Sequence, residues 1–292
     1  MLYNSRRSQV LSRNGMVATS QPLAAMAGLR MLMNGGSAVD GAVAAAAALN
    51  VVEPGSTGIG GDLFALVWDA SKKRISALNA SGRASAASSI RDLEQHGYSY
   101  IPSDSAFGVT VPGTVDGWYT LLSAFGSMSL AEVLAPAIEY AESGYPVSPV
   151  IADDFAKATP KLLRYPSGGE LLLNNNAPRT GEVLRLPELA SSLNIIAEGG
   201  PDAFYRGPLA QKIAGYVQEK GGWLSVQDFA NHTSTWDEPI NTTYRGITCW
   251  ECPPNGQGLN TLMALNIVEG LDIPSMGFQS VAGSHHLIEA MR

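Results

Sequence analysis

Two glycine-rich stretches near the N-terminus constrain the fold more than any other feature of this chain. Gly35-Gly36 ends one predicted helix, and Ser37 with Asp40 three residues later resembles a capping box that opens the next helix, with Asp in place of the usual Glu. That second helix, residues 39–49, is mostly Ala and Val, so its small sides can lie very close to a sheet. Four glycines then fall within residues 55–61, a path that a backbone without Cβ atoms takes easily.

The second glycine stretch does not have the pattern of a phosphate-binding loop. It lacks a Gly-Lys-Ser/Thr ending, and Gly58-Ile59-Gly60-Gly61-Asp62 does not fit G-x-G-x-x-G. It also precedes a predicted strand rather than a helix, so no helix N-terminus faces a phosphate. We therefore expect a tight turn that leads into a buried strand.

The composition is that of a large soluble domain without nucleic-acid or membrane partners. The 292 residues are 45% hydrophobic, which is enough to bury a sizeable core. With 19 basic and 26 acidic residues the net charge is −7, and no basic cluster stands out to attract nucleic acid or anionic lipid. Residues 1–13 lack the apolar run of a secretory signal, and no stretch reaches the roughly 20 apolar residues of a membrane span. The sequence predicts a cytoplasmic protein.

Cys249 and Cys252 form a C-x-x-C pattern that we interpret as two ordinary strand cysteines. A redox motif needs a helix start, where the dipole lowers a thiol pKa, whereas the neighbours here are typical of a strand that ends at Pro253. Side chains three residues apart on a strand point to opposite faces, so the two thiols do not pair easily. A zinc site would need two further ligands at suitable spacing, and the sequence offers none.

The histidines give no metal-binding pattern either. His285 and His286 are adjacent on a predicted helix, where their side chains point about a quarter-turn apart. His96 and His232 lie in polar loops, and we expect both to be solvated.

Strands near both ends, with helices between them, predict one interwoven α/β (α+β) unit over residues 1–292. The last predicted helix is short and stops at the end of the sequence, so we expect the natural polypeptide to continue beyond it. The predicted helices cover residues 22–32, 39–49, 116–124, 130–143, 187–197, 209–220, 257–268 and 285–292, and the predicted strands cover 64–68, 75–78 and the region 108–113.

Ordered motifs from about Asn14 to the end of the sequence resemble the large, N-terminal part of the gamma-glutamyltransferase family, which are autoprocessed N-terminal-nucleophile (Ntn) hydrolases. One of these motifs alone would be weak, but their common order along nearly the whole chain is specific. The matching segments are 15–18, 22–24, 35–40, 52–54, 58–61, 111–113, 136–138, 141–147, 203–207, 228–229 and 253–258.

This resemblance implies that the chain is half of an enzyme. In the family a precursor cuts itself before a threonine, whose hydroxyl becomes the nucleophile and whose own α-amine serves as base. That threonine lies in the small, C-terminal subunit, and this chain shows no Gly-Thr-Thr-His-type processing signature, so we predict that it is not catalytic alone. The implied fold is a four-layered αββα sandwich in which this chain supplies one sheet, an outer helix layer and a helical lobe.

The implied partner is the small subunit of the same precursor, and a dimer of such heterodimers is compatible with the resemblance. No metal or organic cofactor is implied. The sequence leaves the acceptor, the oligomer number and the position of cleavage undetermined.

One residue of this chain is predicted to bind substrate. In the family an arginine after the second strand of the hairpin holds the substrate α-carboxylate. Alignment on Ala84-Ser85 places Ser81 at that position and Arg83 two residues later. Two residues along an extended chain restore the same face, and only a guanidinium offers bidentate hydrogen bonds to a carboxylate. Arg83 is therefore the candidate ligand, the alternative being an ordinary surface arginine with Ser81 at the carboxylate position.

The Ser-Gly-Arg-Ala pattern resembles gamma-glutamyltransferase-like amidohydrolases, such as oxamate amidohydrolase and several acylases, more than the glutathione enzymes. The predicted reaction is therefore threonine-dependent cleavage of the amide in a small carboxylate-bearing substrate of the oxamate type. One alternative is a true gamma-glutamyltransferase that acts on glutathione. An alternative of another class is a non-catalytic relative that binds a small carboxylate or a partner protein.

Overall fold

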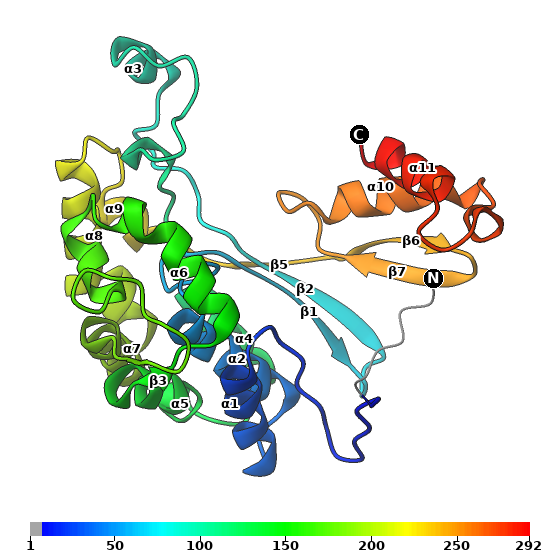
Figure 1. Cartoon of the computed structure of the whole chain (residues 1–292), viewed down its shortest axis with the longest axis horizontal. Coiled ribbons are helices and arrows are strands. Elements are labelled where there is room, and N and C mark those ends of the chain that lie inside the picture. Colours follow the sequence, from blue (N-terminus) through cyan, green and yellow to red (C-terminus); the bar gives the residue numbers. More distant parts are fainter. Residues whose placement is uncertain (1–7) are drawn as a thin grey trace. The chain divides into compact units, whose positions relative to one another are not determined.

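The computed structural model describes residues 8–292, which form two compact units (Figure 1). The helical unit comprises Asn14–Asp62 and Ser81–Thr233, and the strand unit comprises residues 8–13, Leu63–Ala80 and Ser234–Arg292. The first residues of the polar N-terminus lie outside the described part. The sequence predicted a single domain over residues 1–292, and the division into two compact units does not test that prediction.

Most of the predicted helices are present, with ends that differ by a few residues. None of the helices within residues 8–292 combines the length and the apolar composition that crossing a bilayer requires. The helical unit contains α1 (Pro22–Met33), α2 (Ala38–Val52), α3 (Ile90–Gln95), α4 (Thr114–Phe125), α5 (Leu130–Ser143), α6 (Pro149–Leu162), α7 (Pro187–Tyr205), α8 (Pro208–Glu219), α9 (Val226–Ala230) and the short strands β3 (Tyr145–Pro146) and β4 (Val183–Leu184). The strand unit contains β1 (Leu63–Asp69), β2 (Arg74–Ala80), β5 (Thr235–Asp237), β6 (Ile240–Tyr244), β7 (Ile247–Glu251), α10 (Gly258–Glu269) and α11 (Val281–Met291).

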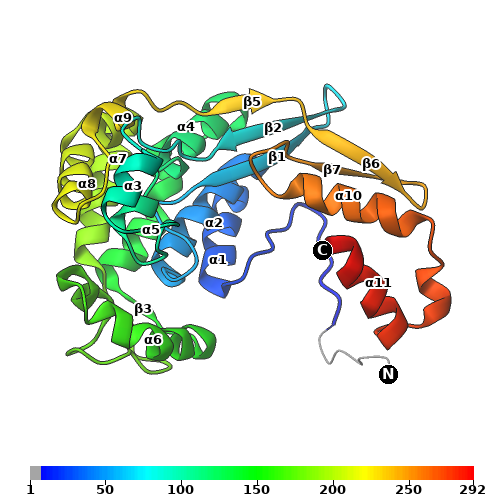
Figure 2. The ribbon, with the colours of Figure 1, turned by 90° about the horizontal axis from the view of Figure 1, so that it is seen from above.

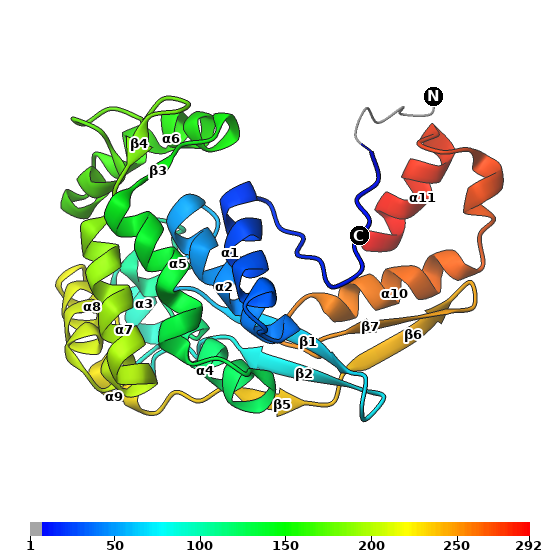
Figure 3. The same ribbon diagram turned by 90° about the horizontal axis from the view of Figure 1, so that it is seen from below.

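Helices α1 and α2 lie side by side at close range in the helical unit (Figure 3). Glycine permits this approach, because a Cβ atom on Gly28 would lie 2.7 Å from the carbonyl oxygen of Gly41. The Ala-rich sequence of α2 leaves most of its residues buried, and its main partners within the helical unit are α1 and α5.

The predicted capping box at the start of α2 is confirmed, and it extends into a buried carboxylate network. The Asp40 carboxylate is fully buried and accepts hydrogen bonds from the Ser37 amide at 2.6 Å, the Ser127 amide at 3.0 Å and the Ser127 hydroxyl at 2.7 Å. Burial by itself raises the pKa of Asp40, but the hydrogen bonds from Ser127 and Ser37 outweigh it, so the pKa lies below its ordinary value. One side chain thereby joins the start of α2 to the turn between α4 and α5.

One local prediction in the helical unit is wrong. The strand predicted within residues 108–113 is absent, and a single 3-10 turn covers Ala106–Gly108 instead. The helix predicted over residues 187–197 is interrupted at Gly200, whose φ 64° and ψ −159° are not helical, and a second helical segment of α7 follows to Tyr205. Glycine tolerates this positive φ, and Pro201 after it begins the next helical turn.

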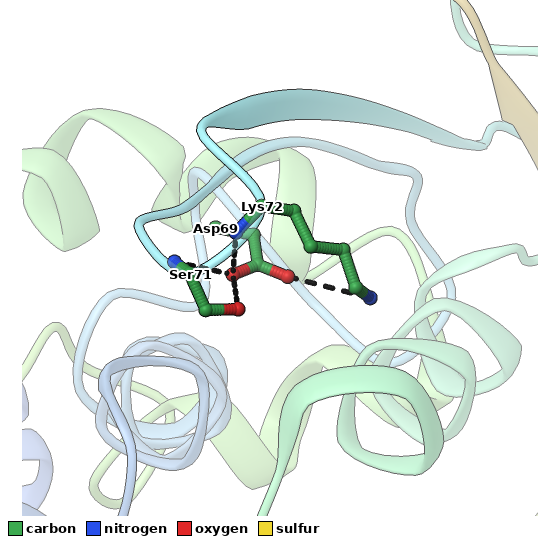
Figure 4. Close-up of polar contacts among 3 residues, drawn as sticks. All are labelled: Asp69, Ser71 and Lys72. Atoms are coloured by element: carbon green, nitrogen blue, oxygen red, sulfur yellow. Dashed lines mark hydrogen bonds and ion pairs between the residues drawn. The ribbon is translucent and has the colours of Figure 1, made fainter.

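The predicted hairpin is confirmed as β1 and β2, which pair antiparallel in a three-stranded sheet of order β1-β2-β5. Its turn is closed by Asp69, as Figure 4 shows. One carboxylate oxygen of Asp69 accepts hydrogen bonds from the Ser71 amide at 2.9 Å, the Ser71 hydroxyl at 2.6 Å and the Lys72 amide at 3.2 Å. A short polar side chain therefore sets the turn that fixes the register of the two strands.

Strand β1 is not the buried strand that the sequence suggested. Its exposure alternates, and Phe64, Leu66 and Trp68 on one face are 39%, 41% and 59% exposed. Ala77, Leu78 and Ala80 of β2 are buried. The described chain thus leaves a row of large apolar side chains uncovered along β1.

The rest of the strand unit is a second hairpin, β6 and β7, with α10 alongside it and α11 against α10 (Figure 2). Glu269 at the end of α10 accepts a hydrogen bond of 3.0 Å from the Arg245 amide in the hairpin turn. Cys249 lies in β7 and Cys252 directly after it, and both are free thiols. The helix predicted over residues 285–292 is present but begins earlier, at Val281.

We predict that Asp40→Asn lowers the free energy of unfolding by about 3 kcal/mol, because it replaces a buried, multiply bonded carboxylate with an amide that offers one acceptor fewer. Glu132→Gln is the matched control, since Glu132 holds the same position in the capping box of α5 but is solvent-exposed. Urea unfolding of both variants measures the difference, and equal midpoints would contradict the assigned role of Asp40.

The same variant has a predictable pH dependence. The folded pKa of Asp40 is lowered from 3.8, so its stabilisation is present above that value and is lost as the pH falls through the folded pKa. The stability difference between wild type and Asp40→Asn should therefore shrink as the pH is lowered below 3.8.

Candidate functional site

The loop that carries Arg83 is fixed where three segments of the helical unit meet. The amides of Gly113 and Thr114 donate to the carbonyl oxygen of Gly61 at 2.9 and 3.0 Å. The Val111 amide donates to the carbonyl oxygen of Arg83 at 3.0 Å. We call residues 58–62, 81–85 and 111–116, together with Tyr205 and His232, the Arg83 junction.

Gly82 allows the chain to pass through this junction. Its amide donates to a carboxylate oxygen of Asp62 at 2.9 Å. A Cβ atom on Gly82 would lie 1.4 Å from the carbonyl oxygen of Val111, a distance that no side chain can accept. By contrast, nothing lies within 4 Å of a Cβ atom built on Gly60. The backbone immediately before Arg83 is therefore held by a contact that only glycine permits.

Downstream of Arg83, the loop is anchored by Ser85. The Ser85 hydroxyl contacts a carboxylate oxygen of Asp228 and the carbonyl oxygen of Trp223, both at 2.9 Å. The Ala86 amide also donates to Asp228, at 2.9 Å. Burial raises the pKa of Asp228, but the hydrogen bonds from Ala86, Ser225 and Ser85 outweigh it and lower the pKa overall. This carboxylate therefore ties the Arg83 loop to the start of α9.

The two sequence candidates, Ser81 and Arg83, both lie in this fixed loop just after β2. Ser81 is half-buried and the Arg83 side chain is exposed. Within residues 8–292 the Arg83 guanidinium has no hydrogen bond or ion pair, so all of its N–H donors are open to a ligand. The role of Arg83 in binding substrate remains a prediction.

His232 does not lie in a solvated loop as the sequence suggested. Both of its ring nitrogens are buried, and neither has a hydrogen-bond partner among the described residues. Its ring stacks on Tyr205, with centroids 5.2 Å apart and planes 24° from parallel. Burial lowers the pKa of His232, and among the charges that act on it Asp116 and Asp62 raise the pKa while Arg83 lowers it further.

Tyr205 holds this ring stack in place from the end of α7. Its hydroxyl donates to the carbonyl oxygen of Pro112 at 2.7 Å and accepts from the Asp116 amide at 3.1 Å. Burial raises the pKa of Tyr205 far above its ordinary value, so the phenol stays neutral and keeps both hydrogen bonds. His232 thus rests on an aromatic ring that is itself bonded to the Arg83 junction.

Sequence reasoning missed His232 because its neighbours in the chain are polar, whereas the residues that bury it come from other segments. Asp228 did appear among the family motifs, but no sequence signal connected it with Ser85. No group of three His, Cys, Asp or Glu side chains within residues 8–292 is arranged to hold a metal ion.

The family follows from comparison with known proteins. The sequence model described as gamma-glutamyltranspeptidase matches residues 24–292. This chain belongs to the gamma-glutamyltranspeptidase family. It is 40% identical over 287 residues to the glutathione hydrolase-like YwrD proenzyme of Bacillus subtilis, with 97% of this chain and 54% of the relative covered. It is 35% identical to the oxamate amidohydrolase proenzyme of Klebsiella pneumoniae, with 98% and 54% covered.

The solved structures place the fold in the same family. The chain matches the crystal structure of cephalosporin acylase from Bacillus halodurans with a TM-score of 0.88 and 41% identity, covering all of this chain and 56% of that one. The predicted mixed α/β, Ntn-hydrolase fold is therefore confirmed. The chain spans about half the length of the curated relatives it matches.

We predict that Gly82→Ala displaces the Arg83 loop, because the added methyl group overlaps the Val111 carbonyl. Hydrogen exchange at the Val111 amide, which donates to the Arg83 carbonyl, should accelerate by at least about tenfold. Gly60→Ala is the control, since its methyl group meets no atom within 4 Å. Unchanged protection of the Val111 amide in Gly82→Ala would show that this close approach does not exist in solution.

Proposed function

We propose that this chain is the large subunit of an autoprocessed amidohydrolase that cleaves the amide of a small carboxylate-bearing substrate of the oxamate type. The observation that carries the proposal is the exposed Arg83 guanidinium, which has no partner within the described residues and stands on a backbone fixed at Gly82 and Ser85. In this role Arg83 binds the substrate carboxylate through two parallel hydrogen bonds and so orients the amide for attack. No metal or organic cofactor forms part of the proposal.

The nucleophile is proposed to be the N-terminal threonine of a small subunit cut from the same precursor. Relatives named as proenzymes are about twice as long as this chain, which supports a second subunit. The uncovered apolar row of Phe64, Leu66 and Trp68 on β1 also supports one, because large apolar patches commonly mark interaction surfaces. In this proposal residues 1–292 act as one large-subunit domain, and two heterodimers can pair.

The position of Arg83 favours a short substrate. The Arg83 backbone lies two residues beyond Ser81, the residue that aligns with the carboxylate-binding arginine of the family. Two residues correspond to about 6.6 Å along an extended chain. In oxamate the carboxylate is bonded directly to the amide carbon, whereas in a γ-glutamyl amide several carbons separate them. A displaced guanidinium suits a substrate whose carboxylate and amide are separated differently from those of a γ-glutamyl amide. A γ-glutamyltransferase that acts on glutathione is therefore only the second candidate.

Processing is the first test. The full precursor, expressed and purified, should yield two polypeptides, the second of which begins with threonine. Intact-mass measurement and N-terminal sequencing check this. A stable, folded large chain without a second polypeptide would instead favour the non-catalytic binding protein.

We predict that Arg83→Ala raises KM for oxamate by roughly tenfold or more, because a charge-assisted hydrogen bond to the carboxylate is lost, while processing continues. Arg91→Ala, which removes another exposed arginine of the helical unit, is the control and should leave KM unchanged. Steady-state kinetics with oxamate and with a γ-glutamyl anilide compare the two candidate substrates. Unchanged kinetics in Arg83→Ala would remove this residue from the site.

A further inference from the structure

Three polar side chains of the Arg83 junction have no hydrogen-bond partner among the described residues, and one of them is the buried Thr114 hydroxyl. The Arg83 guanidinium has no partner within residues 8–292, and neither do the two ring nitrogens of His232. A buried polar atom without a partner costs free energy, so its persistence calls for an explanation.

A short series of contacts joins Arg83 and His232. The Arg83 carbonyl oxygen accepts from the Val111 amide at 3.0 Å. The carbonyl oxygen of the next residue, Pro112, accepts from the Tyr205 hydroxyl at 2.7 Å, and the Tyr205 ring stacks on His232.

We propose that His232 is a positioning residue for Arg83, whose guanidinium donates a hydrogen bond to a ring nitrogen of the neutral imidazole when Arg83 binds the substrate carboxylate. This inference rests on the proposed function, and it adds the residue that selects one orientation of an otherwise free side chain. A guanidinium has five N–H donors, so two can bind the carboxylate while a third binds His232.

The surroundings of His232 suit this role. The ring cannot turn away freely, because it is stacked on Tyr205, whose hydroxyl is bonded to the backbone at Pro112 and Asp116. A neutral imidazole carries one unprotonated nitrogen that can accept a hydrogen bond. Burial and the cation of Arg83 favour that neutral form, whereas the carboxylates of Asp116 and Asp62 oppose it.

The role has a defined dependence on pH. The pKa of His232 lies below 6.5, so the ring is neutral at pH 7 and gains a proton only as the pH falls through that lowered value. A protonated ring offers no acceptor and repels the guanidinium. The affinity for a carboxylate substrate should therefore weaken on the acid side through a step that belongs to His232.

Two substitutions in the full precursor separate positioning from packing. His232→Phe keeps an aromatic ring against Tyr205 but has no nitrogen, and His232→Asn keeps an acceptor that does not titrate. For oxamate we expect His232→Phe to raise KM roughly tenfold with kcat nearly unchanged, and His232→Asn to restore KM to within about threefold of wild type. His96→Gln, at an exposed histidine, is the control and should behave as wild type.

The pH profile of KM gives the second measurement. Titration of the catalytic amine affects wild type and variants alike, so only an acid step present in wild type and missing from both His232 variants belongs to His232. Wild-type KM in His232→Phe, or an acid step that persists in both variants, would overturn the inference. If His232→Phe fails to fold, the loss of the acid step in His232→Asn decides by itself.

An activity-independent measurement separates this inference from the proposed function. The pKa of the His232 ring is followed by NMR in the full protein and in its Arg83→Met variant. We expect the variant to have the higher pKa, because the cation that lowers the pKa of the ring has been removed. An unchanged pKa overturns the inference whatever the protein catalyses, whereas failure of the wild type to turn over oxamate or a γ-glutamyl anilide overturns only the proposed function.

Discussion

The buried carboxylate of Asp40 is the interaction on which the helical unit depends. It caps α2 through Ser37 and at the same time holds the turn after α4 through Ser127, so two parts of the chain that are distant in sequence share one anion. A buried anion is stable only when hydrogen bonds compensate for the lost water, and here donors of Ser37 and Ser127 supply them. Gly126 belongs to the same arrangement, since a Cβ atom there would lie 2.9 Å from an Asp40 oxygen. The Asp40 carboxylate can therefore occupy this place only because residue 126 is a glycine.

The Arg83 junction, which is the candidate site, is held in the same way by a glycine and a carboxylate. Gly82 passes the Val111 carbonyl at a distance that excludes any side chain, and Asp228 collects the donors of the following residues. Both contacts act on the backbone rather than on the Arg83 side chain, which stays exposed. The fold thus fixes the root of a flexible cation and leaves its charged end available, an arrangement that suits a binding residue better than a structural one.

The sequence predicted those features whose cause is local. The capping box of α2 and the β1–β2 hairpin were predictable because the cap and turn residues lie within a few positions of the elements they define. Features that depend on distant segments were not predictable. The burial of His232 is set by Tyr205, and the need for glycine at position 82 is set by the Val111 carbonyl. A polar loop and a flexible glycine gave no sign of either contact.

The family resemblance adds a different kind of knowledge from the local rules. It identified the fold across nearly the whole chain, yet it placed Ser81 where an arginine was expected, and local rules alone nominated Arg83. Gly82 lies between the two candidates, and its amide is bonded to the Asp62 carboxylate while the Arg83 carbonyl is bonded to the Val111 amide. These bonds and the close approach of Gly82 to the Val111 carbonyl keep the loop from sliding by two residues to bring Arg83 into the place of Ser81. If Arg83 binds the carboxylate, the carboxylate must therefore lie at a different place from one bound by an arginine at position 81. The loop would then select substrates by the separation between their carboxylate and their amide.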